Sequence, residues 1–304
     1  MRCGMTSGWV RAGMAGGLLV ALAGSANAQH AGFVLFGEPN AAAAKAPLEN
    51  KFVHPISGPY FHEDSFITTD VRTWLLYHKV DEDIALGGGH AMVAAAQIRV
   101  ALTSWLQLVA YKDGYTWLST PGLETNGAND IAAGLKFGVI QDFENNFHLS
   151  LGAGYQFPWG DPSALQNDGE VRLWGSVNKG FGAFHVGATF NYFIHTSPTD
   201  GDLGNSDRIS WHLHADYRLC DWFSPVLEFN GYHNLTENAS PLAFHGADVG
   251  NFGTGLDDPV ITAALGFEVR PLETLGFRAA FELPLTDGDQ LFGWRVTLSM
   301  VLSF

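Results

Sequence analysis

The sequence has few cysteines, few basic residues and no long apolar run after its first 28 residues. Cys3 lies in an N-terminal leader, so the mature chain keeps Cys220 and can form no intramolecular disulfide. Lys and Arg number 16 against 31 Asp and Glu, a net charge of −15, which argues against nucleic-acid binding because phosphates need a basic surface. A transmembrane helix needs about 20 apolar residues, and the chain after the leader offers no such run.

The leader itself, residues 1–28, has the pattern of an export signal. Arg2 and Arg11 precede the short apolar stretch 14–23, and small residues follow it. This arrangement predicts Sec-type export with cleavage after Ala28. Ser25 stands where a lipoprotein would have its cysteine, so no lipid anchor is expected.

What the chain does have is alternation of apolar and polar residues. In 184–194, for example, the aromatic and aliphatic side chains occupy every second position. A period of two indicates strands, because successive side chains leave opposite faces of a sheet. The stretch 91–110 is rich in Ala and Leu and could form a helix, but its alternation favours two strands. We expect about twelve strands, at residues 67–78, 90–102, 105–117, 129–141, 146–158, 169–179, 183–196, 207–219, 222–234, 258–270, 274–285 and 290–304.

The links between these segments alternate in length. Short links are expected near 103–104, 142–145, 180–182, 220–221 and 271–273. Longer polar links are expected at 79–89, 119–128, 159–168, 197–206 and 235–257, with a short exception at 286–289. Short turns at one end and long loops at the other are typical of outer-membrane barrels. The sequence therefore predicts an all-β transmembrane antiparallel barrel of meander topology over residues 66–304, located in a Gram-negative outer membrane and surrounded by its lipids.

Two further features belong to this interpretation. Aromatic residues near the expected strand ends fit interfacial girdles; they are Trp117, Tyr155, Trp159, Tyr192, Trp222, Tyr232, Phe292 and Trp294. Residues 29–65 lack alternation and are interpreted as a periplasmic leader or an inward-folded plug. We favour a leader that is partly ordered near Tyr60 and Phe61.

If the apolar faces meet lipid, the opposite faces line the lumen, since a lipid-facing Arg or Lys near the bilayer centre costs roughly 2–4 kcal/mol. The candidate lumen residues are Arg72, Arg99, Lys136, Arg172, His212, His214, Asp216, Arg218, Glu228, Glu268, Arg278, Glu282 and Arg295. They either form a constriction that selects a small solute or pair across the lumen and fill it.

Several segments resemble known barrels. The end of the chain, WRVTLSMVLSF (294–304), resembles the closing strand of bacterial outer-membrane barrels, with apolar residues at alternate positions up to the terminal Phe304. That resemblance implies that Met300, Leu302 and Phe304 form the signal read by the barrel-assembly machinery, after periplasmic chaperones have delivered the chain. GANDIAAGLKFGV (127–139) and LSLGAGYQFPWGD (149–161) look like segments of the phenol-degradation meta-pathway (MetA-pathway) transporter family. Membership would imply passive passage of small solutes, aromatic or hydrophobic ones included.

Alternative functions are also considered. A structural or adhesive barrel would present its loops, and an outer-membrane lipid hydrolase would need Ser and His at the outer wall, where His233 and Ser240 are near in sequence. The Gly and Arg that accompany the hydrolase motif are missing, so no catalytic residue is assigned. His212 and His214 share a strand face, but chance explains the pair better than a metal site does. We expect no metal and no cofactor.

Overall fold

The computed structural model describes residues 32–46, 50–196, 206–236, 246–251, 259–286 and 292–304. The predicted export signal, its cleavage after Ala28, and Ser240 lie outside these residues. In the described part of the chain, no helix is long and apolar enough to cross a membrane.

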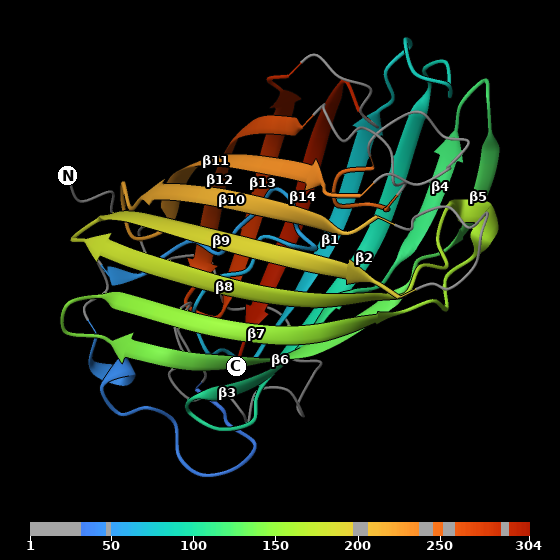
Figure 1. Ribbon diagram of the computed structural model, residues 1–304. Coiled ribbons are helices and arrows are strands. Elements are labelled where there is room, and N and C mark those ends of the chain that lie inside the picture. Colours follow the sequence, from blue (N-terminus) through green and yellow to red (C-terminus); the bar gives the residue numbers. More distant parts are fainter. Residues whose placement is uncertain (1–31, 47–49, 197–205, 237–245, 252–258, 287–291) are drawn as a thin grey trace, which may run out of the picture.

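Nearly all regular structure in the described residues is β-strand (Figure 1). The strands are β1 (Asp70–Lys79), β2 (His90–Ala101), β3 (Leu106–Lys112), β4 (Tyr115–Ser119), β5 (Glu124–Ala128), β6 (Ile131–Asp142), β7 (Phe147–Phe157), β8 (Glu170–Phe181), β9 (Phe184–His195), β10 (Arg208–Tyr217), β11 (Phe223–Asn234), β12 (Val260–Leu272), β13 (Leu275–Pro284) and β14 (Trp294–Ser303). Two 3-10 helices, η2 (Ala43–Lys45) and η4 (Pro162–Ala164), complete them. The stretch 91–110 forms two strands, as its alternation predicted.

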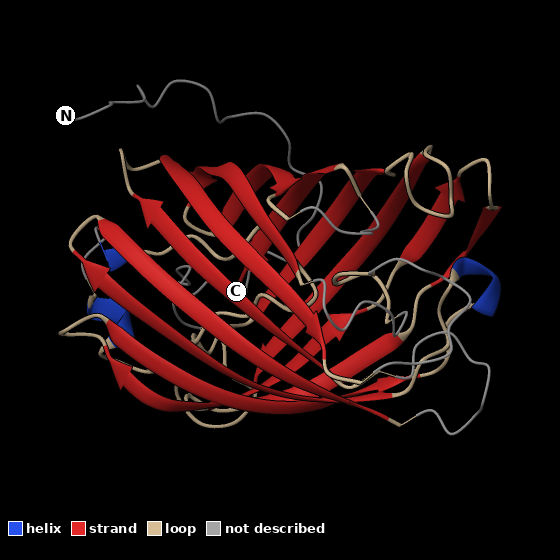
Figure 2. Ribbon diagram, turned by 45° about the horizontal axis from the view of Figure 1, so that its top comes forward, coloured by secondary structure: helices blue, strands red, loops and turns tan. Residues whose placement is uncertain are grey.

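The strands close into a ring (Figure 2). Neighbours in the chain pair antiparallel, except β3 with β4 and β5 with β6, and β1 pairs with both β2 and β14, with Asp70 opposite Ser303. We call each of the strand positions around the ring a stave. β3 and β4 are two parts of one stave, because both pair with β2. β5 and β6 follow one another in the next stave. The structure is therefore a closed 12-stranded antiparallel barrel, which confirms the predicted fold class and meander topology.

The two divided staves depart from the predicted strands. Gly114 separates β3 from β4 with a φ of +115°, and a Cβ at this position would lie 2.5 Å from the Ala94 carbonyl oxygen. Only glycine fits such a position without strain. Because β4 and β5 pair directly, the expected long loop at 119–128 is wrong: the link is a tight hairpin with a four-residue turn, 120–123.

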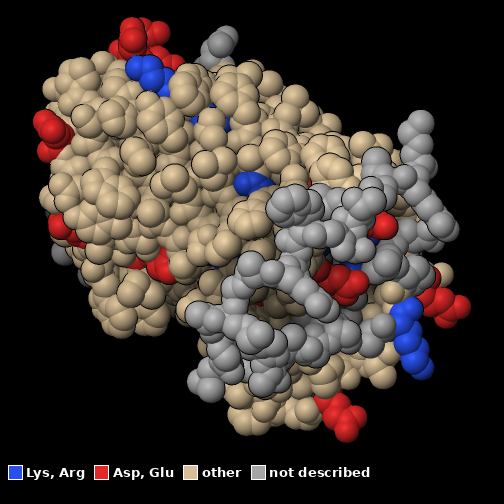
Figure 3. Space-filling view, turned by 180° about the vertical axis from the view of Figure 1, so that it is seen from behind, with Lys and Arg blue, Asp and Glu red and all other residues tan. Residues whose placement is uncertain are grey.

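Along each strand, apolar side chains face outward and polar ones face inward. On β10, Leu213 is 46% exposed whereas His212 is fully buried. Figure 3 shows a largely uncharged outer face, with charged side chains mainly near its margins. Tyr232 and Phe292 do not fit the predicted girdles, because both are buried and pack in a cluster with Tyr60 and Phe61.

Residues 51–66, called the lumen segment below, lie inside the barrel, and every one of them is buried. The segment begins near the short turns: the Asn50 carbonyl accepts a hydrogen bond from Asn146, in the turn between β6 and β7. It reaches the division of the third stave, where the Tyr60 hydroxyl donates to the Asp113 carbonyl at 2.9 Å. It then returns to the starting end, where the Phe304 amide donates to the Thr69 carbonyl at 2.9 Å.

A turn at Gly58 reverses the lumen segment. Gly58 has a φ of +57°, and its carbonyl accepts hydrogen bonds from the amides of Phe61 and His62. The favoured interpretation of residues 29–65 as a periplasmic leader therefore does not describe 51–66. The alternative interpretation, an inward-folded plug, agrees with the position of 51–66. The sequence did not favour it, because contacts with wall residues far away in the chain leave no local pattern.

Candidate functional site

The lumen is the candidate functional site, and the structure gathers most of the predicted lining residues there. Side chains that are buried and lie on the inner face belong to Arg72, Arg99, Lys136, Arg172, His212, His214, Asp216, Glu228, Glu268, Arg278, Glu282 and Arg295. Arg218 differs: it follows the end of β10 and pairs with the exposed Asp221 at 3.4 Å, at the end with the short turns.

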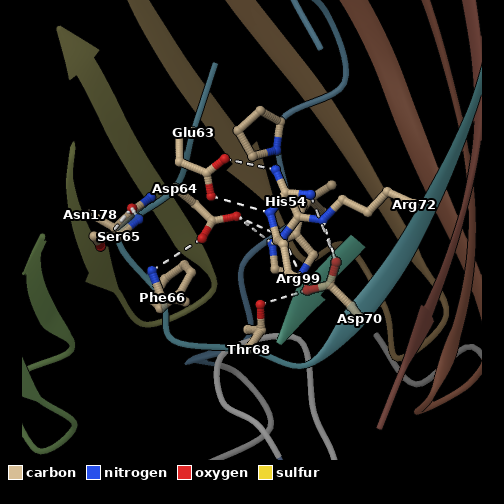
Figure 4. Close-up of polar contacts among 12 residues, drawn as sticks. His54, Glu63, Asp64, Ser65, Phe66, Thr68, Asp70, Arg72, Arg99 and Asn178 are labelled. Carbon is tan, nitrogen blue, oxygen red and sulfur yellow. Dashed lines mark hydrogen bonds and ion pairs between the residues drawn. The ribbon is translucent and has the colours of Figure 1, made fainter. Parts of the chain in front are cut away.

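One side of the wall carries three cations that converge on the lumen segment. Figure 4 shows two of them, Arg72 and Arg99, beside Glu63 and Asp64. Arg99 of β2 binds both carboxylate oxygens of Glu63, at 3.2 and 2.7 Å. Lys136 of β6 lies 2.9 Å from the same carboxylate. Arg72 of β1 lies 3.1 Å from the carboxylate of Asp64. Three strands thus place their charges around two consecutive acidic residues.

The side formed by β10 and β11 is acidic. Glu228 accepts hydrogen bonds from the amides of Ile56 and Ser57 at 2.9 and 2.6 Å, and Asp216 accepts one from the Val53 amide at 3.1 Å. His214 lies between the two carboxylates, 2.7 Å from Glu228 and 3.0 Å from Asp216. Backbone amides of the lumen segment therefore meet the wall's acids.

Two further arginines hold the backbone of the lumen segment. Arg172 of β8 donates to the carbonyls of Tyr60 and Phe61, at 3.1 and 2.8 Å. Arg278 of β13 donates to the carbonyls of His54 and Pro55, at 3.0 and 3.1 Å. Each guanidinium also lies over an indole ring, that of Trp174 for Arg172 at 4.6 Å and that of Trp74 for Arg278 at 4.9 Å. The segment is fixed along its length through both its side chains and its backbone.

A third set of ion pairs lies near the end with the long loops. Arg295 binds Asp248 at 2.6 Å and Glu282 at 2.6 Å. Arg208 binds Glu170 at 2.9 Å and donates to the Ala247 carbonyl at 3.1 Å. Asp248 and Ala247 belong to the described piece 246–251 of the β11–β12 loop, so this loop reaches into the barrel.

His212 and His214 are both engaged with protein groups. The Nδ1 atom of His212 lies 2.7 Å from the Asn230 side-chain oxygen, and His214 lies between Asp216 and Glu228 as described above. In the described residues, no group of three or more His, Cys, Asp or Glu is placed to hold a metal ion.

The hydrolase alternative depends on His233. Its Nε2 atom accepts a hydrogen bond from the Trp211 indole at 3.1 Å. That nitrogen is therefore occupied by a structural partner, the Trp211 indole. Ser240, the other residue of that hypothesis, is outside the described residues.

The sequence prediction missed the lumen segment's own contributions. Glu63, Asp64 and Ser57 all bind the wall, yet they belong to a stretch without strand periodicity. The acidic pair adjoins Tyr60, Phe61 and other bulky apolar residues. Carboxylates beside residues of a kind that is usually buried were the available signal, because buried acids need cationic partners.

Comparison with known proteins agrees with this fold. No family model matches the sequence, and no curated protein matches it. The structure is similar to the COG4313 outer membrane channel from Pseudomonas putida F1, with a TM-score of 0.58 and 16% identity, over 83% of this chain and 100% of that chain. It is also similar to the KdgM porin, with a TM-score of 0.48 and 8% identity, over 77% of this chain and 99% of that chain. At 16% identity, the similarity to the COG4313 channel supports the fold and nothing further. Membership of the phenol-degradation meta-pathway family stays a prediction.

Asp168, in the β7–β8 loop, leads to a prediction about pH. Burial raises the pKa of Asp168 to about 8, against the opposing effect of Lys112. The unfolded chain titrates near the ordinary value of about 4, so the folded state binds the proton more tightly. This contribution to stability is complete below about pH 4 and is lost as the pH rises through about 8. Urea unfolding of the detergent-solubilised barrel should therefore need less urea at pH 9 than at pH 6.

The Asp168→Asn variant should weaken that pH dependence. Asp161→Asn changes an exposed acid of the same loop and should leave the dependence in place. Equal pH dependence in wild type and Asp168→Asn would contradict the assignment to Asp168.

Proposed function

We propose that this chain is a passive channel of the Gram-negative outer membrane, and that the lumen is its pathway for small solutes. The observation that carries the proposal is a closed barrel with an apolar outer face and charged residues inside. Monomeric soluble proteins rarely expose a contiguous apolar patch larger than a few hundred Å², whereas a membrane barrel needs such a band. Closure also satisfies every sheet edge that hydrocarbon could not.

The lumen segment makes this a closed state of the channel. All sixteen residues of the segment, 51–66, are buried inside the ring of strands, where they occupy the lumen that a solute would cross. Solute passage then requires the segment to shift. The contacts with the wall are polar and numerous, so a conducting state exchanges them for contacts with water and solute.

The nature of the lining bears on the solute. Aromatic or hydrophobic solutes, which the family resemblance implies, stay a prediction. The inner wall supplies charged groups on most strands, and such groups favour polar solutes because an apolar solute would strip their water without replacing their hydrogen bonds.

Conductance tests the proposal. Purified wild-type protein in planar bilayers should give small conductance steps. Asn178→Ala should raise the conductance several-fold, because the Asn178 side-chain oxygen accepts hydrogen bonds from the Ser65 amide at 2.9 Å and the Ser65 hydroxyl at 2.8 Å. Asn145→Ala instead removes the exposed amide of Asn145 in the 143–146 turn and should leave conductance at the wild-type level.

The folded state of each protein is verified by the change of its gel mobility on boiling. If folded wild type and folded Asn178→Ala both fail to conduct, the channel proposal is wrong. A structural or adhesive barrel would then be the better description.

A further inference from the structure

The basic cluster of the wall is neutralised largely by the lumen segment. Arg72, Arg99 and Lys136 come from three strands, and their nearest carboxylates in the segment are Glu63 and Asp64, at 2.7 to 3.5 Å. All five side chains are at most 2% exposed. Charges buried to this degree require partners, because an unpaired buried ion is strongly destabilising.

Among the described wall residues, one acid belongs to this cluster. Asp70 of β1 lies 2.8 Å from Arg72 and 3.9 Å from Arg99. Three cations and one carboxylate leave the wall with two excess positive charges. Glu63 and Asp64 supply two negative charges, so the segment balances the wall.

The geometry of this match is that of a bound ligand. Arg99 approaches Glu63 through Nε and Nη2, the fork that fits the two oxygens of a planar carboxylate. Lys136 bridges the two acids, with its Nζ 2.9 Å from Glu63 and 3.5 Å from Asp64. The two carboxylates therefore occupy neighbouring positions that share one ammonium group.

The acidic side of the wall, formed by β10 and β11, binds the lumen segment in a different way from the basic cluster. Glu228 and Asp216 accept hydrogen bonds from backbone amides of the lumen segment at 2.6 to 3.1 Å, whereas the nearest basic side chain of the segment, that of His62, lies 4.0 Å from Glu228. When the segment shifts, those acids can bind water through the same oxygens. The basic cluster, in contrast, loses two full charges and needs an anion in their place.

We propose that Arg72, Arg99 and Lys136 form a binding site for small dicarboxylate solutes, which Glu63 and Asp64 occupy as an internal ligand in the closed state. This proposal rests on the channel function proposed above. A solute with two carboxylates replaces the two charges that leave with the segment. Its binding stabilises the open state, so the solute favours its own passage.

The test uses the full-length variant Glu63→Gln/Asp64→Asn in planar bilayers, with succinate as probe and the uncharged succinamide as matched control. The variant keeps the size of both side chains and removes their charge. It should conduct better than wild type and shift the reversal potential in a KCl gradient toward chloride. Succinate should inhibit the chloride current at a concentration about tenfold lower than succinamide, as expected when an ion pair adds about 1.4 kcal/mol to binding.

Adding Arg99→Gln and Lys136→Gln should abolish the difference between the two probes. If the fourfold variant does not fold, Arg99→Gln alone in the same background should reduce the difference. Equal inhibition by succinate and succinamide in a conducting Glu63→Gln/Asp64→Asn protein overturns the dicarboxylate site and leaves the channel in place. Absence of conductance in every folded protein overturns the channel itself.

Discussion

Replacing Arg295 with methionine is expected to lower the free energy of unfolding by about 3–5 kcal/mol, the usual cost of removing one partner of a buried ion pair. Arg295 binds two carboxylates, those of Asp248 and Glu282, each at 2.6 Å, and all three side chains are at most 1% exposed. Methionine fills much of the volume but leaves two buried acids without their cation. Urea titration in detergent, followed by gel mobility without boiling, measures the loss.

Arg218→Met is the matched control for that experiment. Arg218 pairs with Asp221, whose side chain is 87% exposed, and exposed pairs contribute less than about 1 kcal/mol. The control should therefore unfold within that margin of the wild type. If Arg295→Met and Arg218→Met lose equal stability, the network around Arg295 is weaker than its geometry indicates.

Placing an arginine at Leu265 is expected to destabilise the inserted barrel by roughly 2–4 kcal/mol, the cost of a charge on the lipid face near the bilayer centre. Leu265 lies midway along β12, and its side chain is 70% exposed. Its cross-strand partners, Leu227 and Phe281, are also apolar and exposed. The measurement is the urea midpoint of protein folded into lipid vesicles.

Leu272→Arg provides the depth control, because Leu272 ends the same strand and is 53% exposed. Near the interface the penalty falls to about 0–1 kcal/mol. Equal penalties at Leu265 and Leu272 would mean that the outer face of β12 does not cross a bilayer. The outer-membrane proposal would then have to be abandoned.

The barrel could be predicted from the sequence because its main signal is local. Alternation with a period of two identifies each strand and its inner face from neighbouring residues alone. The expected segment 222–234, for example, became β11 at Phe223–Asn234. The same alternation predicts that Arg72, Arg99 and Lys136 lie on the inner face, and all three are buried there.

The division of the third and fourth staves could not be predicted in the same way. Gly114 is one of 36 glycines, and its importance comes from its distance to Ala94 on another strand. The contacts between the lumen segment and the wall were missed for a related reason. Ser57 binds Glu228 across 171 positions of the chain, and a contact over such a separation leaves no periodic pattern near either residue.

The path of residues 51–66 has one more consequence. Both of its ends lie beside the short turns, and the reversal at Gly58 lies between them. The lumen segment is thus a hairpin whose two ends lie at the same end of the barrel. The chain enters and leaves the lumen at that end and does not pass through the ring of strands. Because β1 begins at Asp70, residues 67–69 alone link the segment covalently to β1, so it can leave the lumen at that end once its noncovalent contacts with the wall are broken.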